Sequence, residues 1–314
     1  MTRFTCRQCG TNDETLRYPS GKMTRCMDCQ RYYNIGANAA RLRKHQPHSP
    51  GVTMTHAEFI GWCRSTPRQC AACGLHETDL PKIGLVSTIG LQVAALGIDR
   101  ISNSADYSLD NIQFCCFACN KAKGNVFDDD ETRLILGPRI GNCWTIRLGG
   151  SVVPVTPPVF ARSAPATPGT CRSCGHDDIN MATDRQCAAC AKFRSLAANS
   201  RRQRKIQATP DLTLTAGEFA DWYATQDTVC VYCGIPEEHL VSTGVRTQVG
   251  HVLRNLGVDR VDNDLGYAPG NMALCCYACN KVKGNVFTGD EMSGQVGPAI
   301  GEIWAGRGIP LLAP

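Results

Sequence analysis

The sequence predicts an α+β protein built from small modules that occur as two tandem copies. The first observation is an internal repeat, in which GIDRISNSADYSLDNIQFCCFACNKAKGNVF at 97–127 returns as GVDRVDNDLGYAPGNMALCCYACNKVKGNVF at 257–287. The second is the 20 cysteines, of which 16 form eight Cys-x-x-Cys pairs. The third is the stretch 149–170, rich in Pro, Gly, Ser and Thr, which is typical of a linker. A duplication acts as an internal alignment, so residues kept in both copies indicate what the module needs.

The paired cysteines predict structural zinc. A gap of two residues is poor for a disulfide, but it places two thiolates on one tetrahedral ion. We therefore expect about four sites of four cysteines each, with reduced buried thiols as the alternative. The expected ligands are Cys6, Cys9, Cys26, Cys29; Cys70, Cys73, Cys116, Cys119; Cys171, Cys174, Cys187, Cys190; and Cys230, Cys233, Cys276, Cys279. Their neighbours Cys115 and Cys275 are expected to pack inward.

Each copy has the same expected order of a zinc ribbon, a basic helix and a larger module that contains the repeated motif. The larger module begins with a short helix, for which Thr55 with Glu58, and Thr215 with Glu218, form a capping-box signature. The expected boundaries are 1–148 for the first repeat (ribbon 1–35, basic helix 36–48, module 52–148), 149–170 for the linker, and 171–314 for the second repeat (ribbon 171–195, basic helix 196–208, module 212–308).

Charge and hydropathy limit the class of protein. No apolar run is long enough to cross a membrane and no signal peptide precedes the first cysteine pair, so we expect an intracellular, reducing compartment, cytoplasm or nucleus. The net charge is +5, but residues 1–150 carry 18 Lys and Arg against 13 Asp and Glu, whereas residues 171–314 carry 14 against 15. A nucleic-acid contact is therefore expected to be local.

Recurring basic residues predict contacts with phosphates, although a charge run is often only a solvated face. Such groups give salt-sensitive binding that depends little on sequence. The expected contacts are Arg41, Arg43, Lys44, Lys121 and Lys123 in the first repeat and Arg201, Arg202, Arg204, Lys205, Lys281 and Lys283 in the second.

The repeated motif also holds an acid and two amides, Asp99, Asn111 and Asn120, mirrored by Asp259, Asn271 and Asn280. A short β-hairpin that leads into a cysteine-anchored helix would bring the first and last of these together. Two oxygen ligands with open positions suit Mg²⁺ or Mn²⁺. The middle Asn would fix the intervening loop through backbone hydrogen bonds. In the alternative, the Asp is a turn residue and the last Asn a helix cap.

The ordered string Asp-Arg-(Ile/Val), Tyr, Asn and Cys-x-x-Cys-Asn-x-x-Lys resembles the HNH endonucleases, whose fold is the zinc-containing ββα-metal or treble-clef type. The resemblance covers about 70–127 and 230–287. It implies structural zinc, metal ligands at the two Asp and the two last Asn, and a central Asn at Asn111 and Asn271. A ribbon followed by a basic helix also looks like the front end of phage-type nucleases of this class.

One position departs from the family. The general-base His normally follows the Asp directly, but here Arg100 and Arg260 stand there. Arginine stays protonated, so it can hold a phosphate but cannot take a proton from water. None of the seven His recurs at the repeat distance. The second repeat keeps more of the family's pattern, at Asp262 and Gly266, so it is the stronger candidate for a cutting half.

Three functions remain open at this stage. The leading one is metal-dependent cleavage or nicking of DNA by a monomer that acts as a pseudo-dimer, with structural zinc and catalytic Mg²⁺ or Mn²⁺. The second is a catalytically silent zinc-dependent clamp on DNA or RNA, DNA being favoured. The third is a protein-interaction scaffold, which the basic residues disfavour. No membrane partner is expected.

Overall fold

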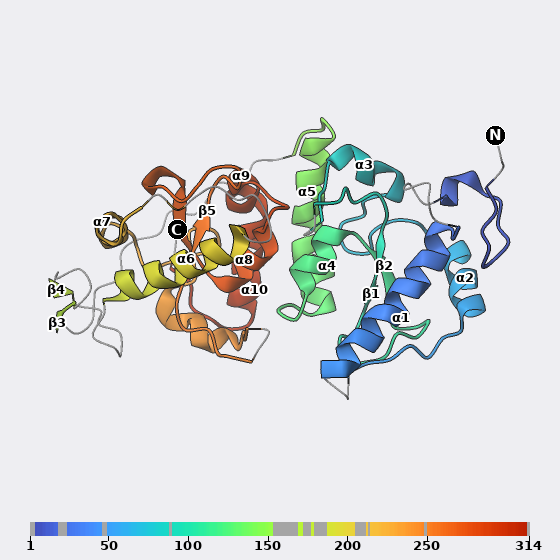
Figure 1. Cartoon of the computed structure of the whole chain (residues 1–314), viewed down its shortest axis with the longest axis horizontal. Helices are drawn as coiled ribbons and strands as arrows, with labels where there is room; N and C mark the ends of the chain where they lie inside the picture. The colour runs from blue at the N-terminus through green and yellow to red at the C-terminus, as the bar shows by residue number, and fades with distance from the viewer. Residues whose placement is uncertain are drawn as a thin grey trace. The chain divides into compact units, whose positions relative to one another are not determined.

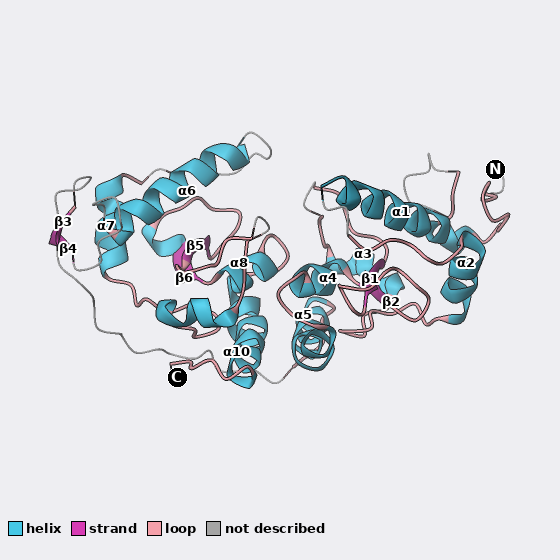
Figure 2. Ribbon diagram, turned by 90° about the horizontal axis from the view of Figure 1, so that it is seen from below, coloured by secondary structure: helices cyan, strands magenta, loops and turns pink. Residues whose placement is uncertain are grey.

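The computed structural model describes residues 4–17, 24–45, 49–87, 90–152, 169–171, 177–178, 187–204, 212, 214–247 and 250–312. The chain divides into two compact units, Met1–Val152 and Val153–Pro314. Short strands, short helices and long loops make up both of them (Figure 2). No helix in the described ranges is long and apolar enough to cross a membrane.

Unit 1 follows the order shown from blue to green in Figure 1. Its elements are η1 (Glu14–Leu16), α1 (Met27–His45), α2 (His56–Ser65), η2 (Glu77–Asp79), α3 (Leu80–Ile83), β1 (Gly97–Arg100), β2 (Ile112–Cys115), α4 (Phe117–Lys123), the π-helical η3 (Glu131–Leu136) and α5 (Gly137–Arg147).

Unit 2 repeats this order with small differences (Figure 1). Its elements are β3 (Gly169–Thr170), β4 (Asp177–Asp178), α6 (Ala188–Arg204), α7 (Ala216–Ala224), η4 (Glu237–Thr243), β5 (Gly257–Arg260), η5 (Pro269–Asn271), β6 (Met272–Cys275), α8 (Tyr277–Lys283), α9 (Gly289–Glu291), the π-helical η6 (Met292–Val296) and α10 (Gly297–Gly306).

The repeated motif forms a hairpin followed by a helix in both units. In unit 1, β1 pairs antiparallel with β2, with Asp99 opposite Gln113. Helix α4 begins directly afterwards because Cys116 caps it, its Sγ accepting the backbone N–H of Cys119 at 3.4 Å. In unit 2, β5, β6 and α8 have the same arrangement, with Cys276 as the cap. The expected entry into a helix through the cysteine turn is therefore present in both copies.

The basic segments differ from the expected division into ribbon and helix. Helix α1 begins at Met27, inside the segment 1–35, because the second cysteine pair of the ribbon stands at its N-terminus. Helix α6 begins at Ala188 in the same way. The basic residues lie on the last turns of these helices, so each helix joins a cysteine cluster to the basic residues as one rigid element.

Aromatic side chains attach the next helix to the hairpin. Thr55 and Glu58 form the expected capping box at the start of α2. The Phe59 side chain is fully buried, and its ring stacks on Trp62 with 5.9 Å between centroids. Trp62 in turn lies 4.7 Å from Phe114 of β2. These contacts bury the apolar side of α2 against the hairpin.

A buried ion network joins α1 to the rest of unit 1. The Arg31 guanidinium binds Asp28 at 2.5 Å and also contacts Glu77. Arg68 binds the second oxygen of Asp28 at 2.6 Å and Glu77 at 3.2 Å. Burial raises the pKa of Asp28, but the hydrogen bond from Arg68 and the charge of Arg31 outweigh it and lower the pKa. Each charge is therefore compensated in the interior.

Unit 2 has a smaller version of this network. Lys192 of α6 binds Glu237 at 2.8 Å and donates to the Leu256 carbonyl at 2.9 Å. Ala189 and Thr228 stand where unit 1 has Asp28 and Arg68. The acid that the copies share, Glu77 or Glu237, accepts the backbone N–H of Leu96 or Leu256 in both.

The networks predict unequal effects of one substitution in the two units. Glu77→Gln removes one of the two acids that Arg31 and Arg68 share and leaves Asp28 as their only carboxylate, which should lower the stability of unit 1 by about 3 kcal/mol. Glu237→Gln should cost less, because the side chains of Lys192 and Glu237 are 10% and 21% exposed, against 6% and 8% for Arg31 and Glu77, so water can compensate the Lys192 charge in part. Hydrogen exchange of the α1 and α6 amides measures each unit separately. Equal losses of protection would contradict the difference between the networks.

Candidate metal centres and the hairpin–helix site

Cysteine side chains gather in four clusters within the described residues. Three contain four cysteines, and their sulfur atoms lie within 4.8 Å of one another. These are Cys6, Cys9, Cys26, Cys29; Cys70, Cys73, Cys116, Cys119; and Cys230, Cys233, Cys276, Cys279. The fourth consists of Cys171, Cys187 and Cys190. Its expected partner Cys174 lies outside the described residues.

The spacing of the sulfur atoms fits tetrahedral zinc. Zinc–sulfur bonds of about 2.3 Å place two ligand sulfurs about 3.8 Å apart. The sulfurs of Cys6 and Cys29 lie 3.6 Å apart, and those of Cys73 and Cys116 lie 3.7 Å apart. None of the 19 described cysteines forms a disulfide. Interaction with its neighbours, Cys115 first, lowers the pKa of Cys70 well below the usual value, whereas the pKa of Cys119 in the same cluster is raised by the same neighbours.

Two further cysteines lie beside the clusters, as expected. Cys115 and Cys275 are buried at the ends of β2 and β6. The Cys115 thiol bonds to Cys70. Cys275 Sγ donates to the Cys276 carbonyl at 3.2 Å. Both thiols therefore lie directly before a cysteine of the cluster, Cys116 in unit 1 and Cys276 in unit 2.

One histidine contacts the first cluster. His56 Nε2, at the start of α2, lies 3.2 Å from Cys29 Sγ, and the His56 ring packs edge-on against Tyr32. An imidazole N–H that donates to a ligand sulfur stabilises the thiolate. Ala216 stands at this place in unit 2. Comparison of the two repeats could not find His56, because it selects only residues that recur.

The Asp of the hairpin is tied to the helix by a buried lysine. In unit 1, Lys123 Nζ lies 2.8 Å from Asp99 Oδ2 and donates to the carbonyls of Arg100 and Ile101, the latter at 3.0 Å. Gln113 Nε2 also donates to Asp99 Oδ2, at 3.2 Å, and to Asp129 at 2.6 Å. Asp99 Oδ2 is thus fixed by two donors from separate elements.

In unit 2 the same Asp has a different neighbour. The Tyr232 hydroxyl donates to Asp259 Oδ2 at 2.7 Å, and Lys283 Nζ lies 3.2 Å from the same oxygen. Burial raises the pKa of Asp259 despite the Lys283 charge, and burial together with the Asp259 charge raises the pKa of Tyr232. Sequence comparison of the repeats missed Tyr232, since Ala72 stands at its place in unit 1.

The expected phosphate contacts at Lys123 and Lys283 are wrong. Their side chains are 1% and 0% exposed, and each bridges the end of a strand to its helix. A charged residue beside the motif was interpreted as a surface group, but an acid and backbone carbonyls compensate its burial. Lys121 and Lys281 are half-buried, and burial lowers the pKa of Lys281.

The Arg that directly follows the strand Asp is engaged with the loop of the hairpin. Arg100 Nη1 donates to the Ala105 carbonyl at 3.0 Å, and the guanidinium lies over the Tyr107 ring at 5.0 Å. Arg260 makes the same pair of contacts with Leu265, at 3.2 Å, and Tyr267, at 5.5 Å. Both side chains are partly exposed, so the remaining guanidinium N–H groups border solvent.

The central Asn holds the same loop closed. The Asn111 side chain accepts the Ser102 N–H at 2.8 Å and donates to the carbonyls of Ser102 and Asp106, at 3.2 and 2.8 Å. Asn271 makes the equivalent bonds to Asp262 and Gly266. These bonds give Asn111 and Asn271 a structural role in shaping the loop.

The last Asn lies on the helix that packs against the first strand. Asn120 precedes Lys123 by three residues on α4, so the two side chains share one face of the helix. Asn280 and Lys283 have the same relation on α8. The Asn is thus placed on the side of the helix that the lysine also occupies, and both Asn120 and Asn280 are partly exposed.

The basic residues of the long helices are only partly described. Arg41, Arg43 and Lys44 are exposed near the end of α1, where Arg43 Nε donates to the Ser49 carbonyl at 3.2 Å. In unit 2, Arg201, Arg202 and Arg204 belong to α6 but their side chains are outside the described part of the structure, and Lys205 lies outside the described residues altogether.

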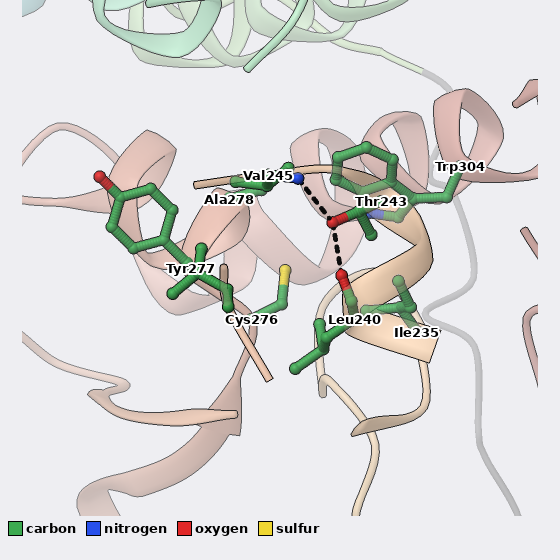
Figure 3. A pocket seen from close by; sticks show the side chains of 9 residues that line it. Ile235, Leu240, Thr243, Val245, Cys276, Tyr277, Ala278 and Trp304 are labelled. Carbon is green, nitrogen blue, oxygen red and sulfur yellow. Dashed lines mark hydrogen bonds between the residues drawn. The ribbon is translucent and has the colours of Figure 1, made fainter. Parts of the chain in front are cut away.

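A hollow behind the second cysteine knuckle of unit 2 is apolar. It is lined by Ile235, Leu240, Thr243, Val245, Leu253, Cys276, Tyr277, Ala278 and Trp304 (Figure 3). The Thr243 hydroxyl is already bonded, donating to the Leu240 carbonyl at 2.7 Å and accepting the Val245 N–H at 3.2 Å. The Thr243 hydroxyl is thus used within the fold and is not turned toward a ligand.

The contact of His56 with the first cluster predicts a difference in zinc retention. Loss of an outer-shell partner weakens metal binding by roughly 10–100-fold. His56→Ala should therefore release one zinc to a chelator markedly faster than the unchanged protein does. Zinc release followed with a chromogenic chelator measures this, and Thr53→Ala on the preceding exposed loop serves as control. Release at the unchanged rate would show that the imidazole does not support Cys29.

Comparison with known proteins finds similarity over part of the chain. No protein-family model matches. Uncharacterized protein R423 of Acanthamoeba polyphaga mimivirus is 24% identical over 187 residues, which are 60% of this chain. The chain spans only 26% of the length of that relative. Among solved structures, the rare-cutting HNH restriction endonuclease PacI is 33% identical, with 45% of this chain and 99% of that chain covered and a TM-score of 0.38.

Proposed function

We propose that the protein is a zinc-stabilised nucleic-acid-binding protein of the HNH type that cleaves or nicks DNA with Mg²⁺ or Mn²⁺. The observation that carries the proposal is the pairing, found twice, of a strand Asp with a cysteine-anchored helix that bears an Asn on the facing side. In each unit, Asp99 or Asp259 is positioned by a lysine of that helix.

The arrangement supports a cation at each Asp. The donors to Asp99 and Asp259 all meet Oδ2. Within the described residues, no hydrogen bond to Oδ1 is found. That oxygen and the side-chain oxygen of Asn120 or Asn280 would supply two hard ligands and leave positions for water and a phosphate oxygen. A bound Mg²⁺ or Mn²⁺ would supply activation of water and neutralise charge on the phosphate.

The other residues would position the substrate. Arg100 and Arg260 keep guanidinium N–H groups at the edge of the loop, where they would hold a phosphate next to the Asp. The bonds to the loop carbonyl and the Tyr ring would fix each guanidinium in place beforehand, which reduces the entropy lost on binding. Zinc would hold hairpin and helix together without entering the chemistry.

Unit 2 is the stronger candidate for cleavage. It keeps Asp262 and Gly266, the positions at which the sequence matches the HNH pattern more closely. Tyr232 supplies a hydroxyl to Asp259. In unit 1 the corresponding space contains Gln113 and Asp129, which form a bond to each other. Nicking of one strand is then expected, with unit 1 serving to bind.

A silent nucleic-acid clamp is the second candidate, and one observation favours it. In both units the Asp already has a buried lysine partner and the Arg is engaged with its own loop. These bonds stabilise the hairpin whether or not a cation binds. A protein that kept them for folding alone would bind DNA or RNA without cutting it.

Substitution of the helix Asn separates the two candidates. Asn280→Ala removes one proposed ligand and leaves the pair of Asp259 with Lys283 intact, so zinc content and stability should not change. Nicking of supercoiled plasmid with Mg²⁺ or Mn²⁺ should fall by roughly 100-fold, the upper end of the effect of groups that support a bound metal. Asn120→Ala is the matched control in unit 1 and should reduce nicking much less.

The outcomes distinguish cleavage from binding. Metal-dependent nicking that survives both substitutions would place the cation elsewhere. Equal losses from Asn280→Ala and Asn120→Ala would give both units a catalytic part. Retention of DNA with no nicking by the unchanged protein would exclude the enzyme and leave the clamp.

A further inference from the structure

A small hairpin precedes the first strand of the site in both units. We call the segments 84–96 and 244–256 the pre-strand hairpins. An isolated antiparallel bridge joins Val86 to Gln92 in the first and Arg246 to Val252 in the second. Their turns close in the same way, since Thr247 donates to the His251 carbonyl at 2.9 Å, as Ser87 does to that of Leu91 at 2.7 Å. The described residues on either side of the two turns thus pair in the same way, and residues 88–89 and 248–249 lie outside the described part of the chain.

The surfaces of the two pre-strand hairpins are chemically different. In unit 1, Val86 and Leu91 are 38% and 63% exposed, and residues 84–96 contain no charged residue. In unit 2 the matching positions hold Arg246 and His251, and Arg254 replaces Ala94. All three of these side chains are exposed.

The guanidinium groups of Arg246 and Arg254 in the pre-strand hairpin of unit 2 are available to bind an anion. Arg246 Nη1 donates to the Gly250 carbonyl at 3.0 Å, which uses one of its five donors. In the described part of the chain, neither Arg246 nor Arg254 forms an ion pair. Residues 244–256 contain no acid, although 171–314 as a whole carry 15 Asp and Glu against 14 Lys and Arg. A local cationic surface therefore stands out from a unit of balanced charge.

The hairpin is fixed to the site that it precedes. The Leu256 N–H donates to Glu237 at 2.7 Å, and the chain enters β5 at the next residue, Gly257. Two residues further on is Asp259. The pre-strand hairpin of unit 2 is thus anchored directly before the strand that carries Asp259 and Arg260.

We propose that the pre-strand hairpin of unit 2 is a contact for the phosphate backbone of a nucleic acid, through Arg246 and Arg254 with His251 as an additional donor. Unit 1 lacks this contact, because its hairpin presents Val86 and Leu91. The choice of nucleic acid as the polyanion rests on the proposed function. The contact adds affinity that does not depend on base sequence, and it makes the two units bind unequally.

The salt dependence of DNA binding tests this contact. Each phosphate contact contributes about 0.9 to the slope of log affinity against log salt. Arg246→Gln/Arg254→Gln in the full chain should lower that slope by roughly 2, as measured by fluorescence anisotropy with a labelled DNA duplex over a series of NaCl concentrations. Zinc content should stay unchanged, because both side chains are exposed.

A charge-matched variant serves as control. Arg17→Gln/Arg133→Gln also removes two exposed cations, but these form ion pairs with Glu14 and Asp130 at 3.6 and 3.2 Å. Its slope should equal that of the unchanged protein. An equal loss of slope in both variants would attribute the effect to net charge and overturn the assignment.

The remaining outcomes separate this contact from the proposed function. An unchanged slope in Arg246→Gln/Arg254→Gln, while the unchanged protein binds DNA, would overturn the contact and leave the proposed function standing. No salt-dependent binding of DNA by the unchanged protein would overturn both.

Discussion

The cysteine knuckle between the second hairpin strand and its helix is the constraint on which each module depends. Strand β2 ends at Cys115 and helix α4 begins at Phe117, so Cys116 alone connects them. This residue belongs to the metal cluster and also caps the helix. Strands of four residues form too few ladder bonds to be stable alone. A tetrahedral ion bound by Cys116 and by the Cys70 and Cys73 turn would therefore set the angle between hairpin and helix.

The contacts of the buried lysine depend on that angle between hairpin and helix. Lys123 extends from the helix to the end of the first strand, where it meets a carboxylate and two backbone carbonyls. Because these acceptors are fixed, the lysine orients Asp99 so that Oδ2 is occupied and Oδ1 is left for another partner. The same lysine joins helix to hairpin and would prepare the proposed cation site, and a surface role for it is excluded by its burial.

The repeat determined how much could be predicted from the sequence. The cysteine sets, the helix after the knuckle and the capping boxes were predictable because both copies keep them and because spacing fixes their geometry. Tyr232 and His56 were not, since each belongs to one copy only. The start of α1 at Met27 was also missed, because composition marks only its basic end. The lysine's role depends on long-range packing, which no local pattern encodes.

Cys116 is a member of the metal cluster and also the cap of α4, so oxidation of its sulfur would affect both. Modification of one sulfur would remove a zinc ligand and, at the same time, the acceptor that starts α4. The helix carries both Asn120 and Lys123, so the orientation of Asp99 would be lost in the same event. Oxidation of one sulfur atom would thus displace Asn120, Lys123 and Asp99 together. In a zinc-bound module, the geometry and the metal would thus both depend on the reduced state of this one sulfur.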